Sequence, residues 1–337
     1  MKKLFIITVF FTICCAAWAQ QPPVRVLFIG NSFTFTNDVP SILKNLAQSQ
    51  GKQVITQANC VPGESFKGHA QSDSTNKLIR QANYDYVVLQ GYSREFTHSH
   101  DSIAQASLPY VKQLMDSITK YAPQAIPIFY MTWGYKNGTK LPTPFDNFDD
   151  MNTIIQRRYE KLAQRYGCWV APVGVAWATV YHKNPDINLY GSDDYHPSLA
   201  GSYLVACTLH SMLFNERCNT QYYAGLPGKQ AVALQQAASN TVEYSLCRWK
   251  YRDCDVVFDK NSPEVFPNPA QDRVIFNIPH CEYATISIHN LLGQEIDRFE
   301  SVKIPYTIFP IVYADGVYFV KMEYNNTVFT NRLIIRK

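Results

Sequence analysis

The sequence predicts an α/β domain built on a parallel sheet, followed by a small all-β sandwich. Short apolar segments alternate with longer helical segments over the first two thirds of the chain. After about residue 255 the chain changes to short runs of period two, separated by Pro, Asn and Gly. The length of 337 residues exceeds the usual ~100–200 residues per domain, which also favours two domains.

Composition excludes several classes of protein. The chain is 46% hydrophobic and only 17% charged, which rules out a disordered or collagen-like protein. A net charge of +4 makes no strong electrostatic case for a nucleic-acid or anionic membrane partner. Low charge together with 22 Tyr and 19 Phe is compatible with a secreted protein that faces glycans.

The first 19 residues predict a secretory signal peptide. Lys2 and Lys3 precede the apolar run Leu4–Ile13, and Ala17–Ala19 has the form of a cleavage site. The apolar run is too short to anchor the chain in a bilayer. No other stretch approaches ~18 uninterrupted apolar residues, so we expect no transmembrane segment in the mature protein and a secreted or cell-surface location.

Two of the nine cysteines lie in the signal peptide, which leaves an odd number in the mature chain. Export permits disulfides, and the closest pairs in sequence are Cys207 with Cys218 and Cys247 with Cys254. No cysteine has the C-x-x-C spacing of a zinc site. We therefore expect buried thiols with one or two disulfides.

Four continuous apolar runs predict strands that are buried on both faces of a parallel sheet. They are Val24–Ile29, Tyr86–Leu89, Ile126–Met131 and Cys168–Val173. Helical segments separate them. Asp38 and Pro40 provide the N-cap and first turn of a helix that runs to about Gln50. Further helices are predicted at Ile103–Tyr121, at Phe148–Tyr166 before Gly167, and at Ser198–Leu213.

Residues suited to nucleophilic catalysis follow the first strand and precede the last helix. In Gly30-Asn31-Ser32 the glycine allows a sharp turn, and the serine can project its hydroxyl above the carboxyl edge of the sheet. A nucleophilic serine needs a base, and His196 is the best candidate. Asp193 lies three residues earlier and can reach one ring nitrogen while the other faces the serine. Ser32, Asp193 and His196 thus form a candidate triad.

The segments Gly30–Ser32 and Asp193–Pro197 resemble the first and last sequence blocks of the SGNH/GDSL hydrolase superfamily. The similarity extends over roughly residues 24–240. It implies a flavodoxin-like three-layer α/β/α fold and hydrolysis of esters of sugars, lipids or other alcohols. It also implies Ser32 as nucleophile, His196 as base and Asp193 as the residue that orients it, with no metal or other cofactor.

The resemblance further implies three donors to an oxyanion: the N–H groups of Ser32 and Gly63 and a side-chain amide. The superfamily generally has an asparagine after the third strand, whereas this chain has Leu89-Gln90-Gly91. Gln90 has the same carboxamide on a longer stem and is the candidate third donor. A secreted bacterial branch of the superfamily shares this Leu-Gln ending.

Other polar and aromatic residues have competing interpretations. Trp133 could stack on a sugar ring or pack in the core, and His69 could line the pocket or cap the next helix. These two are candidate substrate-binding residues. The segment His98–Asp101 resembles a metal cluster only superficially, since no further ligands follow at a suitable spacing, and no metal site is predicted.

The tail resembles the C-terminal sorting domain of type IX secretion substrates. The similarity covers about residues 263–337 and rests on four ordered segments: Val265–Pro269, Asn290–Gln294, Gly316–Lys321 and Arg332–Lys337. It implies a β-sandwich that directs the protein to the type IX secretion machinery. A carbohydrate-binding sandwich is the alternative, but the aromatic residues fall on apparent core positions rather than on one exposed face.

These observations predict a signal peptide at 1–19, an SGNH hydrolase-like domain at 20–246, a linker at 247–262 and a sorting domain at 263–337. The resemblance implies a secreted serine esterase, whose substrates would be O-acyl groups on glycans, acetyl above all, or other small esters. The alternative is an SGNH-fold glycan-binding or adhesin-like surface protein in which catalysis has decayed. The complete triad favours the enzyme.

Overall fold

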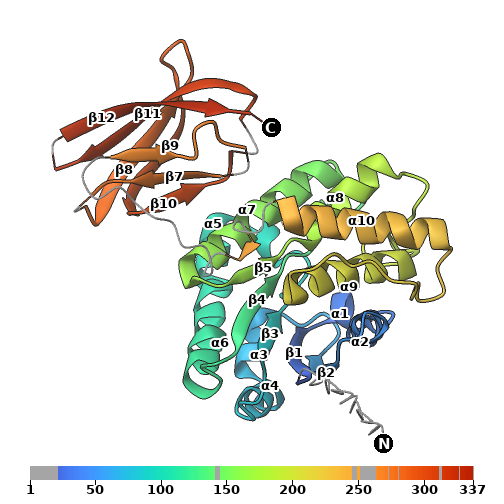
Figure 1. Cartoon of the computed structure of the whole chain (residues 1–337). Coiled ribbons are helices and arrows are strands. Elements are labelled where there is room, and N and C mark those ends of the chain that lie inside the picture. Colours follow the sequence, from blue (N-terminus) through green and yellow to red (C-terminus); the bar gives the residue numbers. More distant parts are fainter. Residues whose placement is uncertain are drawn as a thin grey trace, which may run out of the picture.

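The computed structural model describes residues 22–140, 145–244, 249–250, 263–271, 273–279, 281–310, 313–325 and 327–336. The predicted signal peptide lies outside the described residues, as does most of the predicted linker. Figure 1 shows an α/β domain, coloured blue to golden orange, and a β-sandwich, coloured orange to red. The predicted fold class is confirmed.

The centre of the first domain is a parallel five-stranded sheet in the order β2-β1-β3-β4-β5. Its strands are β1 Val24–Gly30, β2 Val54–Cys60, β3 Tyr86–Leu89, β4 Ile126–Tyr130 and β5 Trp169–Ala171. The four strands predicted from apolar runs are present. β2 has no such run because it is an edge strand, in which only Val54 is buried. The order reverses beside β1, which places the carboxyl ends of β1 and β3 at a switch point where α/β proteins bind ligands.

Helices cover both faces of the sheet (Figure 1). One layer contains α2 Val39–Ser49, α8 Val173–Lys183, α9 Leu199–Phe214 and α10 Gly228–Tyr244, which contact one another. A second group contains α3 Phe66–Gln71, α4 Asp73–Ile79, α5 His100–Ala106 and α6 Leu108–Tyr121. The long α7 Phe148–Tyr166 contacts β4 and β5.

Local capping residues set the bounds of several helices as predicted. Asp38 accepts a hydrogen bond from the N–H of Ser41 at the start of α2, and Ser198 caps α9 in the same way. Gly167 ends α7 in the left-handed conformation. The predicted helix Ile103–Tyr121 is instead two helices that meet at Ser107, because Pro109 lacks the N–H that a continuous helix would need.

The C-terminal sandwich has two antiparallel sheets with their own apolar core. One sheet contains β6 Glu264–Phe266, β7 Val274–Asn277 and β10 Tyr306–Ile308. The other contains β8 Tyr283–His289, β9 Glu295–Lys303, β11 Gly316–Tyr324 and β12 Thr327–Ile335. The predicted period-two runs correspond to β7, β8 and β11.

Two residues of the predicted linker pack on the first domain. Trp249 is 1% exposed within the larger core, and its indole N–H donates to the carbonyl of Thr241 at 2.8 Å. Lys250 pairs with Trp169 through a β-bridge and places its Nζ 4.0 Å from the centre of that ring. We therefore propose that the first domain extends to Lys250.

The predicted pairing of Cys207 with Cys218 is not present as a disulfide. Both residues are free, buried thiols, and their side chains form a hydrogen bond with each other. The second predicted pair, Cys247 and Cys254, lies outside the described residues.

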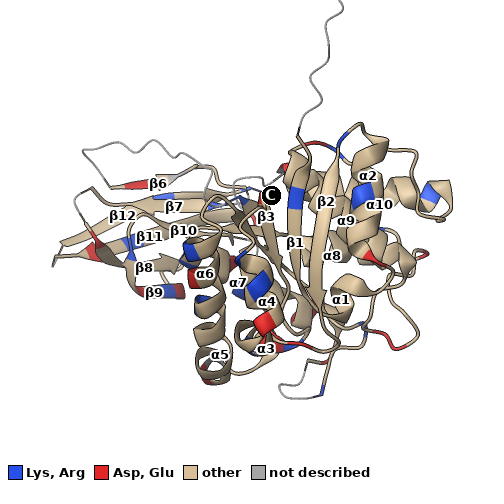
Figure 2. Ribbon diagram, turned by 90° about the horizontal axis from the view of Figure 1, so that it is seen from below, with Lys and Arg blue, Asp and Glu red and all other residues tan. Residues whose placement is uncertain are grey.

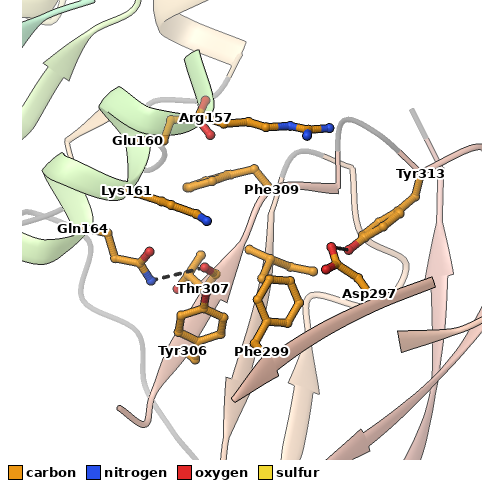
Figure 3. Close-up of a pocket in the computed structure, with 11 residues that line it drawn as sticks. Arg157, Glu160, Lys161, Gln164, Asp297, Phe299, Tyr306, Thr307, Phe309 and Tyr313 are labelled. Atoms are coloured by element: carbon orange, nitrogen blue, oxygen red, sulfur yellow. Dashed lines mark hydrogen bonds between the residues drawn. The ribbon is translucent and has the colours of Figure 1, made fainter. Parts of the chain in front are cut away.

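A cavity of about 230 Å³ separates α7 from the sandwich (Figure 3). Gln164 of α7 crosses this boundary, where its Nε2 donates to the carbonyl of Thr307 at 3.2 Å. Within the sandwich, the hydroxyl of Tyr313 donates to Oδ2 of Asp297 at 2.7 Å. The described part of the chain thus shows a small polar contact between two separate apolar cores.

Charged residues of both signs are interspersed along the described ribbon (Figure 2). Among the described residues, no helix combines the length and apolarity that crossing a membrane requires.

A buried histidine predicts an acid-sensitive domain. His210 of α9 is 0% exposed, and neither ring nitrogen has a hydrogen-bond partner among the described residues. Burial, assisted by Lys52, lowers the pKa of His210 to about 4. The unfolded chain, with a histidine pKa near ~6.5, therefore binds more protons between these two values.

We expect the unfolding free energy to fall as the pH drops from about 6.5 to 4, by roughly 3 kcal/mol from this residue. His210→Leu should remove that part of the pH dependence. Urea unfolding followed by tryptophan fluorescence measures the unfolding free energy of the first domain in the mature protein. The tryptophans after the signal peptide all lie in the core of this domain: Trp133, Trp169, Trp177 and Trp249. Parallel pH profiles of the two proteins would contradict the prediction.

Candidate active site

The loop after β1 carries the candidate nucleophile. Gly30 ends the strand, Asn31 caps α1 Ser32–Phe35, and Ser32 is the first residue of that short helix. A Cβ atom at Gly30 would lie 2.7 Å from Oε1 of Gln90 and 2.8 Å from Oγ1 of Thr34. The glycine is therefore required by the close approach of neighbouring side chains as well as by the turn.

Asn31 joins the ends of three strands. Its Nδ2 donates to the carbonyl of Glu64, after β2, at 2.8 Å and to the carbonyl of Gly91, after β3, at 3.2 Å. Its Oδ1 accepts from the N–H of Phe33 at 3.1 Å. Asn31 is 2% exposed, so these bonds lie away from water and hold the Ser32 turn in one conformation.

The structure brings the three predicted triad residues together. Nε2 of His196 lies 2.7 Å from Oγ of Ser32, and Nδ1 lies 2.6 Å from Oδ2 of Asp193. The other carboxylate oxygen of Asp193 accepts from the N–H groups of His196 at 2.9 Å and Tyr195 at 3.2 Å. With Nδ1–H donating to Asp193, Nε2 is the nitrogen that can accept the serine proton.

Partial burial acts to raise the pKa of Asp193, but the opposing hydrogen bonds are stronger in sum. These come from the side chain of His196 and from the backbone N–H groups of His196 and Tyr195, and together they lower the pKa. Asp193 therefore remains a carboxylate at neutral pH, which is the form that fixes the imidazole tautomer.

Two of the three predicted oxyanion donors lie at the site. The N–H groups of Ser32 and Gly63 have no hydrogen-bond partner among the described residues, and both residues line the same cavity. Gly63 has φ +66°, a backbone conformation that favours glycine. Two N–H groups beside a serine hydroxyl can stabilise negative charge on an attacked carbonyl.

Gln90 does not reach this cavity. It is 0% exposed, its Oε1 accepts from the N–H of Asn31 at 2.9 Å and from the hydroxyl of Thr34 at 3.0 Å, and its Nε2 donates to the carbonyl of Gly91. The Gln90 side chain is thus bonded to the turn that carries Ser32. The expected role as third oxyanion donor does not agree with this arrangement, which instead makes Gln90 a support for the turn.

Exchanging Gln90 for Met should destabilise the first domain by roughly 2–4 kcal/mol, since it leaves the N–H of Asn31 and the hydroxyl of Thr34 buried without acceptors. Met fills a similar volume, which limits the packing loss. Urea unfolding followed by tryptophan fluorescence measures the change. An oxyanion donor would instead lower kcat by about 10²–10³-fold with little change in stability.

The two candidate substrate-binding residues lie in the core rather than in the cavity. Trp133 is 0% exposed and is stacked between Phe33, at 4.5 Å, and Trp177, at 3.8 Å between ring centres. Its indole N–H donates to the carbonyl of Tyr195 at 3.1 Å. Trp133 therefore cannot stack on a sugar, but it supports the loop that carries His196.

His69 is likewise 0% exposed, with Nε2 2.8 Å from the carbonyl of Gly30 and Nδ1 3.1 Å from Oγ1 of Thr75. Burial lowers its pKa, although the contact with Gly30 and the charge of Glu64 oppose this. His69 thus ties α3 and α4 to the end of β1 and does not face a substrate.

The cavity around Ser32 has a volume of about 920 Å³, within the range of ligand sites. The sequence motifs did not single out several of its lining residues. Their positions after strands whose carboxyl ends share one edge of the sheet were the signal that could have identified them. From the loops after β3 and β4 and before α9 they are Tyr92, Ser93, Arg94, Tyr135 and Tyr195. From the loops after β1 and β2 they include Phe35, Thr36 and Pro62.

Among the described residues, no three His, Cys, Asp or Glu side chains gather in a way that could hold a metal ion. His98 is partly exposed at the end of η1 Glu95–Thr97. Burial lowers the pKa of His98, and Arg94 and Arg158 lower it further.

Different known proteins resemble the two domains. Residues 264–336 match the profile of the secretion system C-terminal sorting domain. This match confirms the predicted sorting domain and implies export of the chain. The chain has no match among curated proteins.

The fold of the first domain is shared with a DUF4886 family protein from Bacteroides uniformis. The two are 23% identical with a TM-score of 0.57, over 66% of this chain and 96% of that one. More distant matches include a putative GDSL-like lipase from Parabacteroides merdae, with 13% identity and a TM-score of 0.39 over 54% and 92% of the two chains. An acetyl xylan esterase has 19% identity and a TM-score of 0.40, over 54% and 96%.

Proposed function

We propose that this protein is a secreted serine esterase of the SGNH/GDSL type, exported by the type IX machinery. The observation that carries the proposal is the continuous hydrogen-bonded chain from Ser32 through His196 to Asp193, beside a large cavity. A serine hydroxyl is a weak nucleophile unless a base accepts its proton. His196 is placed to be that base, because its contact with Asp193 favours the tautomer that leaves Nε2 free to accept the proton.

In the proposed reaction, Oγ of Ser32 attacks the ester carbonyl while its proton passes to Nε2 of His196. The oxyanion that forms accepts hydrogen bonds from the N–H groups of Ser32 and Gly63. His196 then returns the proton to the departing alcohol, which leaves an acyl group on Ser32. A water molecule activated by His196 hydrolyses this acyl-enzyme and restores the serine.

The proposed substrates are O-acylated glycans, with acetyl as the preferred acyl group. The cavity supports this class because tyrosine rings and polar groups lie beside Ser32, and tyrosine combines a flat apolar face with a hydroxyl that sugars can bond. A volume of about 920 Å³ accommodates a sugar unit together with its acyl group.

A fluorophosphonate probe tests the nucleophile directly. We expect the mature protein to be labelled and to hydrolyse p-nitrophenyl acetate, whereas Ser32→Ala is not labelled and retains only residual hydrolysis. Ser192→Ala is the matched control, because Ser192 is an exposed serine in the loop that carries His196. No labelling of the mature protein, with background hydrolysis equal to that of Ser32→Ala, would exclude the esterase and favour a glycan-binding protein.

A further inference from the structure

The cavity beside Ser32 is charged on one side. Among its described lining residues, Arg94 carries a full positive charge and none is Asp or Glu. Arg94 follows β3 on the same loop as Tyr92, and its Nη2 donates to the hydroxyl of Tyr92 at 3.0 Å. This bond raises the pKa of Arg94 against the opposing effect of burial, so the charge persists at all physiological pH values.

Three tyrosines, Tyr92, Tyr135 and Tyr195, line the cavity together with Arg94 and His196, and we call them the tyrosine wall. The hydroxyls of Ser93 and Tyr135 are 2.6 Å apart, the rings of Tyr135 and Tyr195 lie 5.0 Å apart, and Tyr195 lies 4.4 Å from the ring of His196. Arg94 and Ser32 line the same cavity, so one molecule that carries both a carboxylate and an ester can contact both residues.

The loop that carries Arg94 is held in place from inside the protein. Glu95 is 5% exposed, and its Oε2 accepts from the N–H of Tyr92 at 2.9 Å and from the N–H of Phe66 at 3.2 Å. The carboxyl of Glu95 thus points into the core, whereas Arg94 lines the cavity. On the other side of the loop, Arg158 of α7 donates to the carbonyls of Phe96 and His98.

We propose that the substrate is an ester that carries a carboxylate, which Arg94 binds while the tyrosine wall contacts the rest of the molecule. A guanidinium attracts a carboxylate and donates charge-assisted hydrogen bonds to it, and none of the described lining residues is acidic. This inference rests on the proposed esterase function and narrows its substrate class. The carboxylate can belong to the alcohol, as in an acylated uronic acid, or to the acyl group, as in a half-ester of a dicarboxylic acid.

Matched substrate pairs test the inference. For the alcohol, an O-acetylated methyl glucuronide is compared with its uronamide, which has nearly the same shape without the charge. For the acyl group, p-nitrophenyl hydrogen succinate is compared with p-nitrophenyl butyrate. We expect one pair to show a preference of about 10- to 100-fold in kcat/KM for the acid, the range expected of a hydrogen bond between charged groups.

Variants of Arg94 test whether this residue causes the preference for the acid. Arg94→Gln should reduce the acid-to-neutral ratio to near one, and Arg94→Lys should retain part of it because the charge persists without the planar fork. Lys140→Gln is the control for loss of charge alone. Lys140 is 78% exposed, lies outside the cavity lining and pairs with Asp146 at 3.4 Å, so its replacement should leave the ratio unchanged.

The outcomes separate this inference from the proposed function. Hydrolysis that depends on Ser32 but shows no preference for acid in either pair would overturn the carboxylate site and leave the esterase intact. If no ester is hydrolysed, binding of both matched pairs to Ser32→Ala, measured by calorimetry, decides the inference separately. Equal affinity for the acid and the neutral compound in both pairs would overturn it, and tighter binding of an acid that Arg94→Gln abolishes would support it.

Discussion

Alanine at Ser32, at His196 or at both positions is expected to lower kcat for p-nitrophenyl acetate by nearly the same factor, about 10⁴–10⁶. The reason is that the serine and its base act as one unit. Their 2.7 Å contact transfers a proton only when both are present, so removing the second residue after the first costs little more. Purified single and double variants, assayed with the mature protein under saturating substrate, measure these factors.

Residual hydrolysis above the uncatalysed rate should survive in all three variants, since the N–H groups of Ser32 and Gly63 come from the backbone. Circular dichroism serves as the control for folding. Effects that multiply in the double variant would show that Ser32 and His196 act independently, contrary to the proposed mechanism.

Asp193→Asn is the second change with a large expected effect, a loss in kcat of about 10⁴-fold. An amide at this position can donate to Nδ1 and so favours the tautomer with its proton on Nε2. His196 could then no longer accept the proton of Ser32. Because Asn has the same size as Asp, the loss would arise from proton placement rather than from packing.

Asp194→Asn is its matched control. Asp194 is adjacent in sequence, but its carboxylate pairs with Lys136 at 3.3 Å and accepts from Asn137 at 3.1 Å, away from His196. Its φ of +62° is tolerated by Asn, so the substitution should keep the loop conformation. We expect kcat within a few-fold of the unchanged protein, and an equal loss in both variants would remove Asp193 from its assigned role.

The organisation of the site explains why a loop can hold a catalytic geometry. Asn31, Gln90 and His69 each bond the end of β1 or the turn that follows it, and all three are nearly inaccessible to water. Buried bonds of this kind are expensive to break, because the separated groups would lack water as a partner. The turn that carries Ser32 is thereby fixed by residues that do not face the cavity.

Short-range patterns in the sequence determined much of the fold. Asp38, Gly167 and Ser198 set helix bounds through contacts within a few residues, and the apolar runs of β1, β3 and β4 mark strands that are buried on both faces. The spacing of Asp193 and His196 similarly allows their contact within one turn of chain. Such features depend on local geometry, which a sequence displays directly.

Side-chain direction was decided by the tertiary structure. Gln90 faces the turn of Asn31, 59 residues away, and Trp133 donates to a carbonyl 62 residues away, so their expected exposure to substrate was replaced by burial. Arg94 gained its place in the cavity only when the loops after four strands met at one edge of the sheet. The sequence by itself thus determined the elements and a candidate triad, whereas packing between distant segments decided which polar side chains support the site and which can reach a substrate.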